Sequence, residues 1–125
     1  MTIGICLAAG AVHAFIAAGQ FTLAWTHSIE KIRWEEDYRV AGGMLHLDEA
    51  RIRGSGAGME PPAGALLIDG VWHYRPAVRE LRELRLARST YTADYELCIP
   101  GAPCKSLASW IPVDAGTTLV APCSR

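Results

Sequence analysis

Residues 21–31 read FTLAWTHSIEK, and their alternating pattern decides the fold. Every second side chain from the start of the stretch is apolar: Phe21, Leu23, Trp25 and Ile29. This period of two predicts a β-strand with one buried face. His27 falls in the same phase. A buried imidazole requires a polar partner, so the stretch also predicts that a second polar side chain lies nearby.

The following stretch, WEEDYRV at residues 34–40, has a matching break in its own apolar pattern at Glu36. A hairpin connection over residues 30–33 places His27 opposite Glu36. The same register pairs Trp25 with Tyr38 and Leu23 with Val40, and gives the pair an aromatic wall of Trp25, Trp34 and Tyr38. Two interpretations remain open: a satisfied polar pair in an aromatic core, or a functional pair with a tuned pKa.

Similar strand patterns recur along the whole chain, with turn residues between them. We predict strands at 3–8, 11–17, 21–29, 34–40, 44–53, 65–68, 71–74, 84–89, 95–99 and 117–120. Asp69-Gly70 is the clearest hairpin turn. The sequence therefore predicts one mostly β domain over residues 1–125, an antiparallel β-sandwich or barrel-like fold, with one short helix near 77–83. The arginines of residues 76–88 are interpreted as a solvated surface.

Charge excludes some classes of partner. Twelve Lys and Arg stand against 13 Asp and Glu, and no block of like charges occurs. A nucleic-acid partner or direct binding to an anionic membrane is therefore not expected. The first charged side chain is Glu30. Residues 1–20 are either two buried strands or a membrane or signal segment, and strands are favoured because nothing basic precedes Lys31.

The four cysteines favour disulfides. Cys98 and Cys104 flank the turn-forming residues IPGAP, and Cys6 and Cys123 lie on the first and last predicted strands. Free buried thiols are the alternative. A zinc site is disfavoured because no CxxC pair is present, so we expect no metal and no cofactor.

A glycine-rich stretch, GSGAGM, follows the predicted strand 44–53. It is interpreted either as a turn or as a backbone loop for a carboxylate or similar anion, formed by Gly54, Ser55, Gly56 and Gly58. A catalytic role is the alternative function, a small hydrolase-like enzyme that uses His27 and Glu36. No GxSxG elbow is present, and His46 and His73 have no carboxylate at a telling spacing, so we assign no catalytic residue.

Several of these motifs resemble an uncharacterised bacterial family, domain of unknown function 1850. The similar stretches are FTLAWTHSIEK at 21–31, WEEDYRV at 34–40, SGAGM at 55–59, VWHYRP at 71–76, DYELCIPGAPC at 94–104 and APC at 121–123. Such proteins are often encoded beside tripartite ATP-independent periplasmic (TRAP) transporters of the TAXI type. The resemblance implies a non-enzymatic accessory or binding module of that uptake system, outside the cytoplasm, whose partners are transporter subunits and whose membrane association runs only through them. It supplies no reaction.

Overall fold

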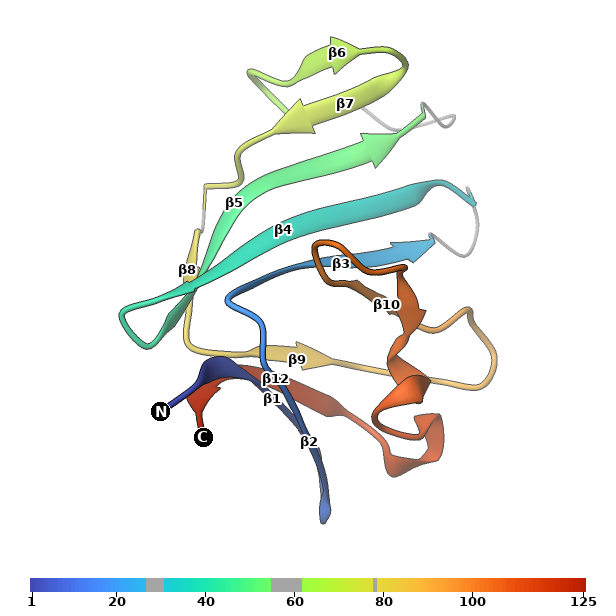
Figure 1. The fold of residues 1–125 in the computed structure, drawn as a ribbon. Coiled ribbons are helices and arrows are strands. Elements are labelled where there is room, and N and C mark those ends of the chain that lie inside the picture. The colour runs from blue at the N-terminus through green and yellow to red at the C-terminus, as the bar shows by residue number, and fades with distance from the viewer. Residues whose placement is uncertain (27–30, 55–61, 78) are drawn as a thin grey trace.

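Two antiparallel sheets pack against each other in the computed structural model, which describes residues 1–26, 31–54, 62–77 and 79–125 (Figure 1). The small sheet has the strand order β2-β1-β12-β9, and the large sheet β11-β10-β3-β4-β5-β7-β6, with β8 also paired to β5. The strands are β1 (Ile3–Ala9), β2 (Val12–Ile16), β3 (Gln20–Thr26), β4 (Arg33–Ala41), β5 (Met44–Arg53), β6 (Leu66–Ile68), β7 (Val71–Tyr74), β8 (Glu80–Leu81), β9 (Leu84–Leu86), β10 (Glu96–Cys98), β11 (Lys105–Ser106) and β12 (Thr118–Ser124). The prediction of a mostly β, sandwich-like fold is confirmed, and the sheets do not close into a barrel.

The prediction of a short helix near 77–83 is wrong. Glu80 and Leu81 form β8, where Leu81 pairs with Leu45 and Glu80 with His46 of β5. The free edge of β5 offers hydrogen bonds to this segment, and tertiary pairing outweighs the weak helical propensity of a few residues. The only helical segments in the described ranges are two 3-10 turns, η1 (Leu107–Ser109) and η2 (Val113–Ala115).

The uncharged N-terminal run forms two paired strands, as predicted. β1 pairs with β2 and with the last strand, β12. Gly10, with φ of 58°, lies in the turn between β1 and β2. Across the residues described, no helix has the length and apolar character needed to cross a membrane.

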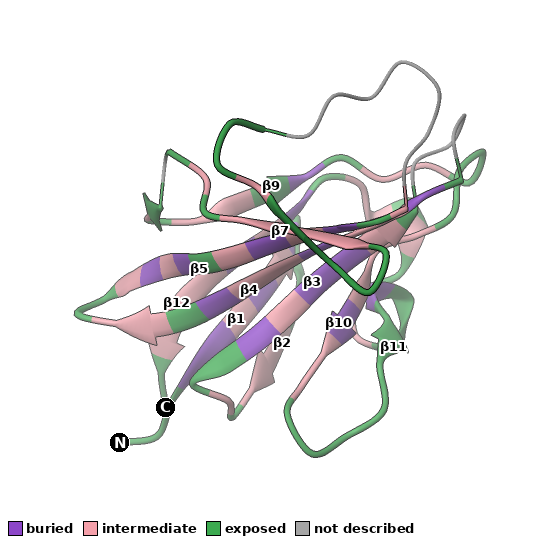
Figure 2. Ribbon diagram, turned by 90° about the horizontal axis from the view of Figure 1, so that it is seen from above, coloured by how far each residue is buried: buried purple, intermediate pink, exposed green. Residues whose placement is uncertain are grey.

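The core lies between the two sheets and is built from the inward-facing positions of each strand (Figure 2). The small sheet contributes Ile5, Leu7, Leu86 and Val120, the large sheet contributes Phe21, Leu23, Leu45, Leu47 and Leu97, and Leu107 and Ile111 come from η1 and the residues after it. Alternation along β3 therefore decides which face is buried, as the sequence predicted.

The register between β3 and β4 differs from the prediction by four residues. Trp25 pairs with Trp34, Leu23 with Glu36 and Phe21 with Tyr38, and the last described pair is Thr26 with Arg33. Stacking of Trp25 on Trp34, with ring centroids 6.2 Å apart, favours the observed register. A shift by an even number of residues leaves every side chain on its predicted face.

Two disulfides, Cys6–Cys123 and Cys98–Cys104, confirm the predicted pairing. The first joins β1 to β12 beside the two chain ends, where the backbones of Thr2 and Arg125 also exchange hydrogen bonds. The second closes the turn between β10 and β11. Their Cα atoms are 5.8 and 4.1 Å apart.

Candidate ligand-binding cleft

A cleft of about 1020 Å³ opens on the outer face of the large sheet, away from the core. Its floor consists of outward-facing side chains of four neighbouring strands: Thr22 of β3, Asp37 of β4, Glu49 and Arg51 of β5, and His73 of β7. Rigid, hydrogen-bonded strands therefore hold these polar groups in place, as a binding site requires.

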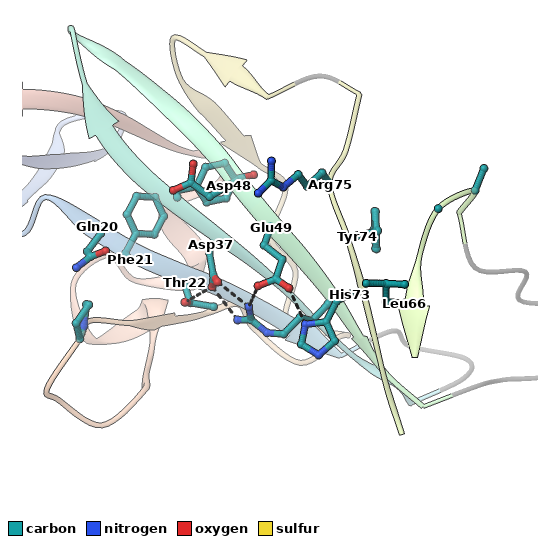
Figure 3. Close-up of a pocket in the computed structure, with 15 residues that line it drawn as sticks. Gln20, Phe21, Thr22, Asp37, Asp48, Glu49, Leu66, His73, Tyr74 and Arg75 are labelled. Carbon is teal, nitrogen blue, oxygen red and sulfur yellow. Dashed lines mark hydrogen bonds and ion pairs between the residues drawn. The ribbon is translucent and has the colours of Figure 1, made fainter. Parts of the chain in front are cut away.

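Arg51 is the centre of an ionic network on this floor (Figure 3). Its Nη1 and Nη2 donate to the two oxygens of Asp37 at 2.6 and 2.7 Å, and Nη1 also donates to Glu49 at 3.1 Å. Thr22 Oγ1 donates to Asp37 Oδ1 at 2.7 Å. The Nδ1 of His73 lies 2.6 Å from Glu49 Oε1. The network thus crosses four strands without a break.

A β-bulge in β5 explains why Glu49 and Arg51 face outward. Asp37 pairs with Glu49, but the next residue, Tyr38, pairs with Leu47, so Asp48 has no cross-strand partner. An extra residue reverses the alternation on one side of it. Leu47 therefore faces the core, while Glu49 and Arg51 face the cleft. The sequence carries this signal: in LHLDEARI the apolar phase of residues 45 and 47 changes to 50 and 52 after Asp48.

Hydrogen bonds keep the carboxylates of this face ionised. Burial disfavours the charged form of Asp37, but hydrogen bonds from Arg51 and Thr22 outweigh it and lower its pKa. Glu35, a neighbour on β4, also has a lowered pKa, because hydrogen bonds from three arginines overcome its burial. A carboxylate that is held ionised in this way is a weak proton acceptor, so Asp37 suits an electrostatic role better than a catalytic one.

The sequence assigned His73 no carboxylate partner, because that partner, Glu49, is 24 residues away along the chain. Pairing of β5 with β7 sets His73 opposite Arg51 and so brings its ring beside Glu49. The Asp69-Gly70 turn predicted the β6–β7 hairpin, but nothing local in the sequence shows which strand that hairpin joins.

Glu36, one member of the predicted pair, lies on the opposite face of the sheet from the cleft floor. Its cross-strand neighbour is Leu23, and its Oε1 accepts a hydrogen bond from the hydroxyl of Tyr38 at 2.8 Å. Burial raises the pKa of Glu36, and the Tyr38 hydrogen bond only partly offsets this. His27 lies outside the described residues. The register that suggested the pair is wrong, because it placed His27 where Leu23 lies.

Replacing Glu36 with glutamine is expected to stabilise the protein at pH 7. Because the pKa of Glu36 is raised in the folded state, its contribution to stability is complete at low pH and is lost as the pH rises through that pKa. Glutamine keeps the acceptor for Tyr38 and removes the ionisation. Urea unfolding should therefore show a gain at pH 7 that disappears near about pH 4, where glutamic acid is largely protonated.

Glu35→Gln on the same strand is the matched control, and it should lower the free energy of unfolding at pH 7 instead of raising it. The pKa of Glu35 is lowered, so its contribution to stability is present at pH 7 and is lost as the pH falls. A loss of stability in Glu36→Gln at pH 7 would contradict the prediction and would favour an ion pair between Glu36 and His27.

The remaining predicted site residues fall in different places. Trp25, Trp34 and Tyr38 lie on the inward face around Glu36, with Trp25 also 6.1 Å from the ring of Tyr95. Of the glycine loop, Gly54 directly follows β5 with φ of 118°, a conformation that favours glycine. Ser55, Gly56 and Gly58 lie outside the described residues. None of the described residues forms a cluster of three or more metal-ligating side chains.

Fold and cleft together define a small, disulfide-bonded antiparallel β-sandwich with a polar cleft on one outer face. The family described as Domain of unknown function (DUF1850) matches residues 21–105, and the chain belongs to that family. No curated protein and no solved structure shows significant similarity to the chain.

Proposed function

We propose that the protein is a non-enzymatic binding module that assists a TAXI-type TRAP uptake transporter, with the outer cleft as its ligand site. The observation that carries the binding role is the preformed floor: Asp37, Glu49, Arg51 and His73 are fixed by one another before any ligand arrives. Such preorganisation lowers the entropic cost of binding. Family membership supports the link to the transporter, since relatives are often encoded beside its components.

The chemistry of the cleft favours binding over hydrolysis. His73 and Glu49 resemble the base and orienting acid of a catalytic triad. The third member of a triad, an activated nucleophile, is missing from the described lining. Thr22 carries the one aliphatic hydroxyl there, and it donates to Asp37, which Arg51 holds ionised. A hydroxyl bonded to a weak base is not activated for attack.

The proposed place of action is the extracytoplasmic side. Disulfides persist in oxidising compartments such as the periplasm and are rare in the cytosol of ordinary bacteria. All four cysteines of the chain are paired. An accessory of a periplasmic uptake system would work in that compartment.

Affinity purification tests the transporter association. A tagged wild-type chain, co-expressed with the transporter subunits encoded beside it, is expected to retain at least one of them from detergent-solubilised envelopes. Excess untagged chain should displace the retained subunit, whereas the same chain reduced and unfolded should not. Retention of no subunit, or retention that the folded competitor leaves unchanged, would contradict the accessory role.

A further inference from the structure

The acidic side chains of the cleft already have hydrogen-bonding partners within the protein itself. Asp37 accepts from both terminal nitrogens of Arg51. Glu49 accepts from Arg51 and lies against His73. Asp48 accepts from Arg39 twice, each at 3.2 Å. Each of these carboxylates therefore has a partner within the protein, whereas a donor of the cleft lining does not.

Arg75 is that donor. It directly follows β7, lines the cleft and is exposed, and it makes no hydrogen bond or ion pair with any residue in the described ranges. Figure 3 shows that its side chain and that of His73 both extend from the β7 side over the floor of the cleft. A guanidinium offers five N–H donors in a planar fork that matches a carboxylate.

An apolar surface lies next to these polar groups. Leu66 of β6 is 64% exposed and pairs with His73 across the hairpin, so the two side chains share the outer face. Ile68, 50% exposed, follows on the same face of β6. Leu66, which lines the cleft, loses contact with water when a ligand covers it, and this favours an apolar ligand body.

We propose that the cleft binds a small organic carboxylate, with the anionic group at Arg75 and the apolar body against Leu66. This inference rests on the proposed binding function and deepens it by naming the class of ligand. His73 contributes indirectly, because its Nδ1 lies 2.6 Å from Glu49 Oε1 and holds that side chain in place.

Calorimetric titration with three probes of similar shape and different head group tests the class of ligand. Hexanoate is expected to bind saturably to the oxidised wild-type protein, hexanamide at least about tenfold more weakly, and hexylamine not at all, since a charge-assisted hydrogen bond is worth about tenfold or more in affinity. Absence of hexanoate binding, or tighter binding of hexylamine, would overturn the proposal.

Variants then test the position of the anionic group. Arg75→Ala should weaken hexanoate binding at least about tenfold, and Arg75→Lys should restore part of it, because lysine keeps the charge without the planar fork. Arg82, an exposed arginine outside the cleft lining, is the matched control, and Arg82→Ala should leave binding unchanged. Equal affinity of wild type and Arg75→Ala would exclude Arg75 as the anchor.

Failure of this proposal can be separated from failure of the proposed function. A protein that retains transporter subunits but binds no hexanoate refutes the carboxylate site alone. A protein that binds hexanoate through Arg75 but retains no subunit refutes the transporter role and leaves the site established.

Discussion

Replacing Arg88 with alanine is expected to lower the free energy of unfolding by about 3–5 kcal/mol, the range for breaking a buried ion pair by removing one partner. The side chain of Arg88 is 0% exposed and that of Asp94 14%. The guanidinium holds Asp94 through Nε at 3.0 Å and Nη2 at 2.8 Å. Alanine leaves this carboxylate poorly solvated and without its cation.

Arg88 also joins three segments that are distant along the chain. It donates to Thr118 Oγ1 of β12 at 3.0 Å and to the backbone oxygens of Ile111 and Pro112 at 2.8 and 3.3 Å. These carbonyls lie between η1 and η2, where no sheet ladder supplies donors. Loss of Arg88 thus removes several hydrogen bonds together, most of them partly buried.

Urea unfolding at pH 7 measures the effect, with Arg85→Ala as the control. Arg85 lies two residues earlier, its side chain is 73% exposed, and its ion-pair partner is Glu83. Surface substitutions of this kind change stability by about 0.5 kcal/mol or less. A loss below about 1 kcal/mol in Arg88→Ala would show that the buried network contributes little beyond its own desolvation cost.

The contrast between Arg85 and Arg88 shows what the sequence can predict here and what it cannot. The arginines of residues 76–88 were interpreted as a solvated surface, and for the exposed Arg85 the structure agrees. The side chain of Arg88 is buried because Asp94, Thr118 and two carbonyls converge on it. The local sequence pattern shows the polarity of a residue. The partners that offset the cost of burying it are brought to it only by the tertiary fold.

Face assignment was more predictable than register. Alternation along residues 20–26 and 33–41 is a local property, so it correctly identified the inward side chains, among them Trp25 and Glu36. Register depends on which cross-strand contacts form and on the length of the connection, and a shift of four residues preserves the alternation. The two polar breaks at residues 27 and 36 were an attractive match, but they did not specify the pairing.

The cleft could not be assembled from local spacing. Its floor depends on the bulge at Asp48, on the pairing of β5 with β7, and on the register in which β3 pairs with β4. Only the bulge leaves a trace in the sequence, as a change of apolar phase. The pair predicted for a hydrolase-like site was expected on the inward face of the sheet, whereas the described polar network lies on the outward face.

Removing the Cys6–Cys123 disulfide with a double alanine variant is expected to cost about 4–5 kcal/mol of unfolding free energy. The bridge spans 117 residues, nearly the whole chain. A cross-link limits the conformations of the unfolded chain, and this effect grows with loop length, reaching about 4.7 kcal/mol for a loop of about 100 residues. Urea unfolding of the oxidised proteins at pH 7 provides the measurement.

The second disulfide is an internal control for the mechanism, because it differs chiefly in loop length. Cys98 and Cys104 are six residues apart, for which the same relation gives about 2 kcal/mol. The double alanine variant at 98 and 104 should therefore lose about half as much stability as the variant at 6 and 123. If the short-loop variant lost as much or more, loop entropy would not be the main contribution. The stabilisation would then lie in the folded state, at the turn that places Pro100 against the cleft.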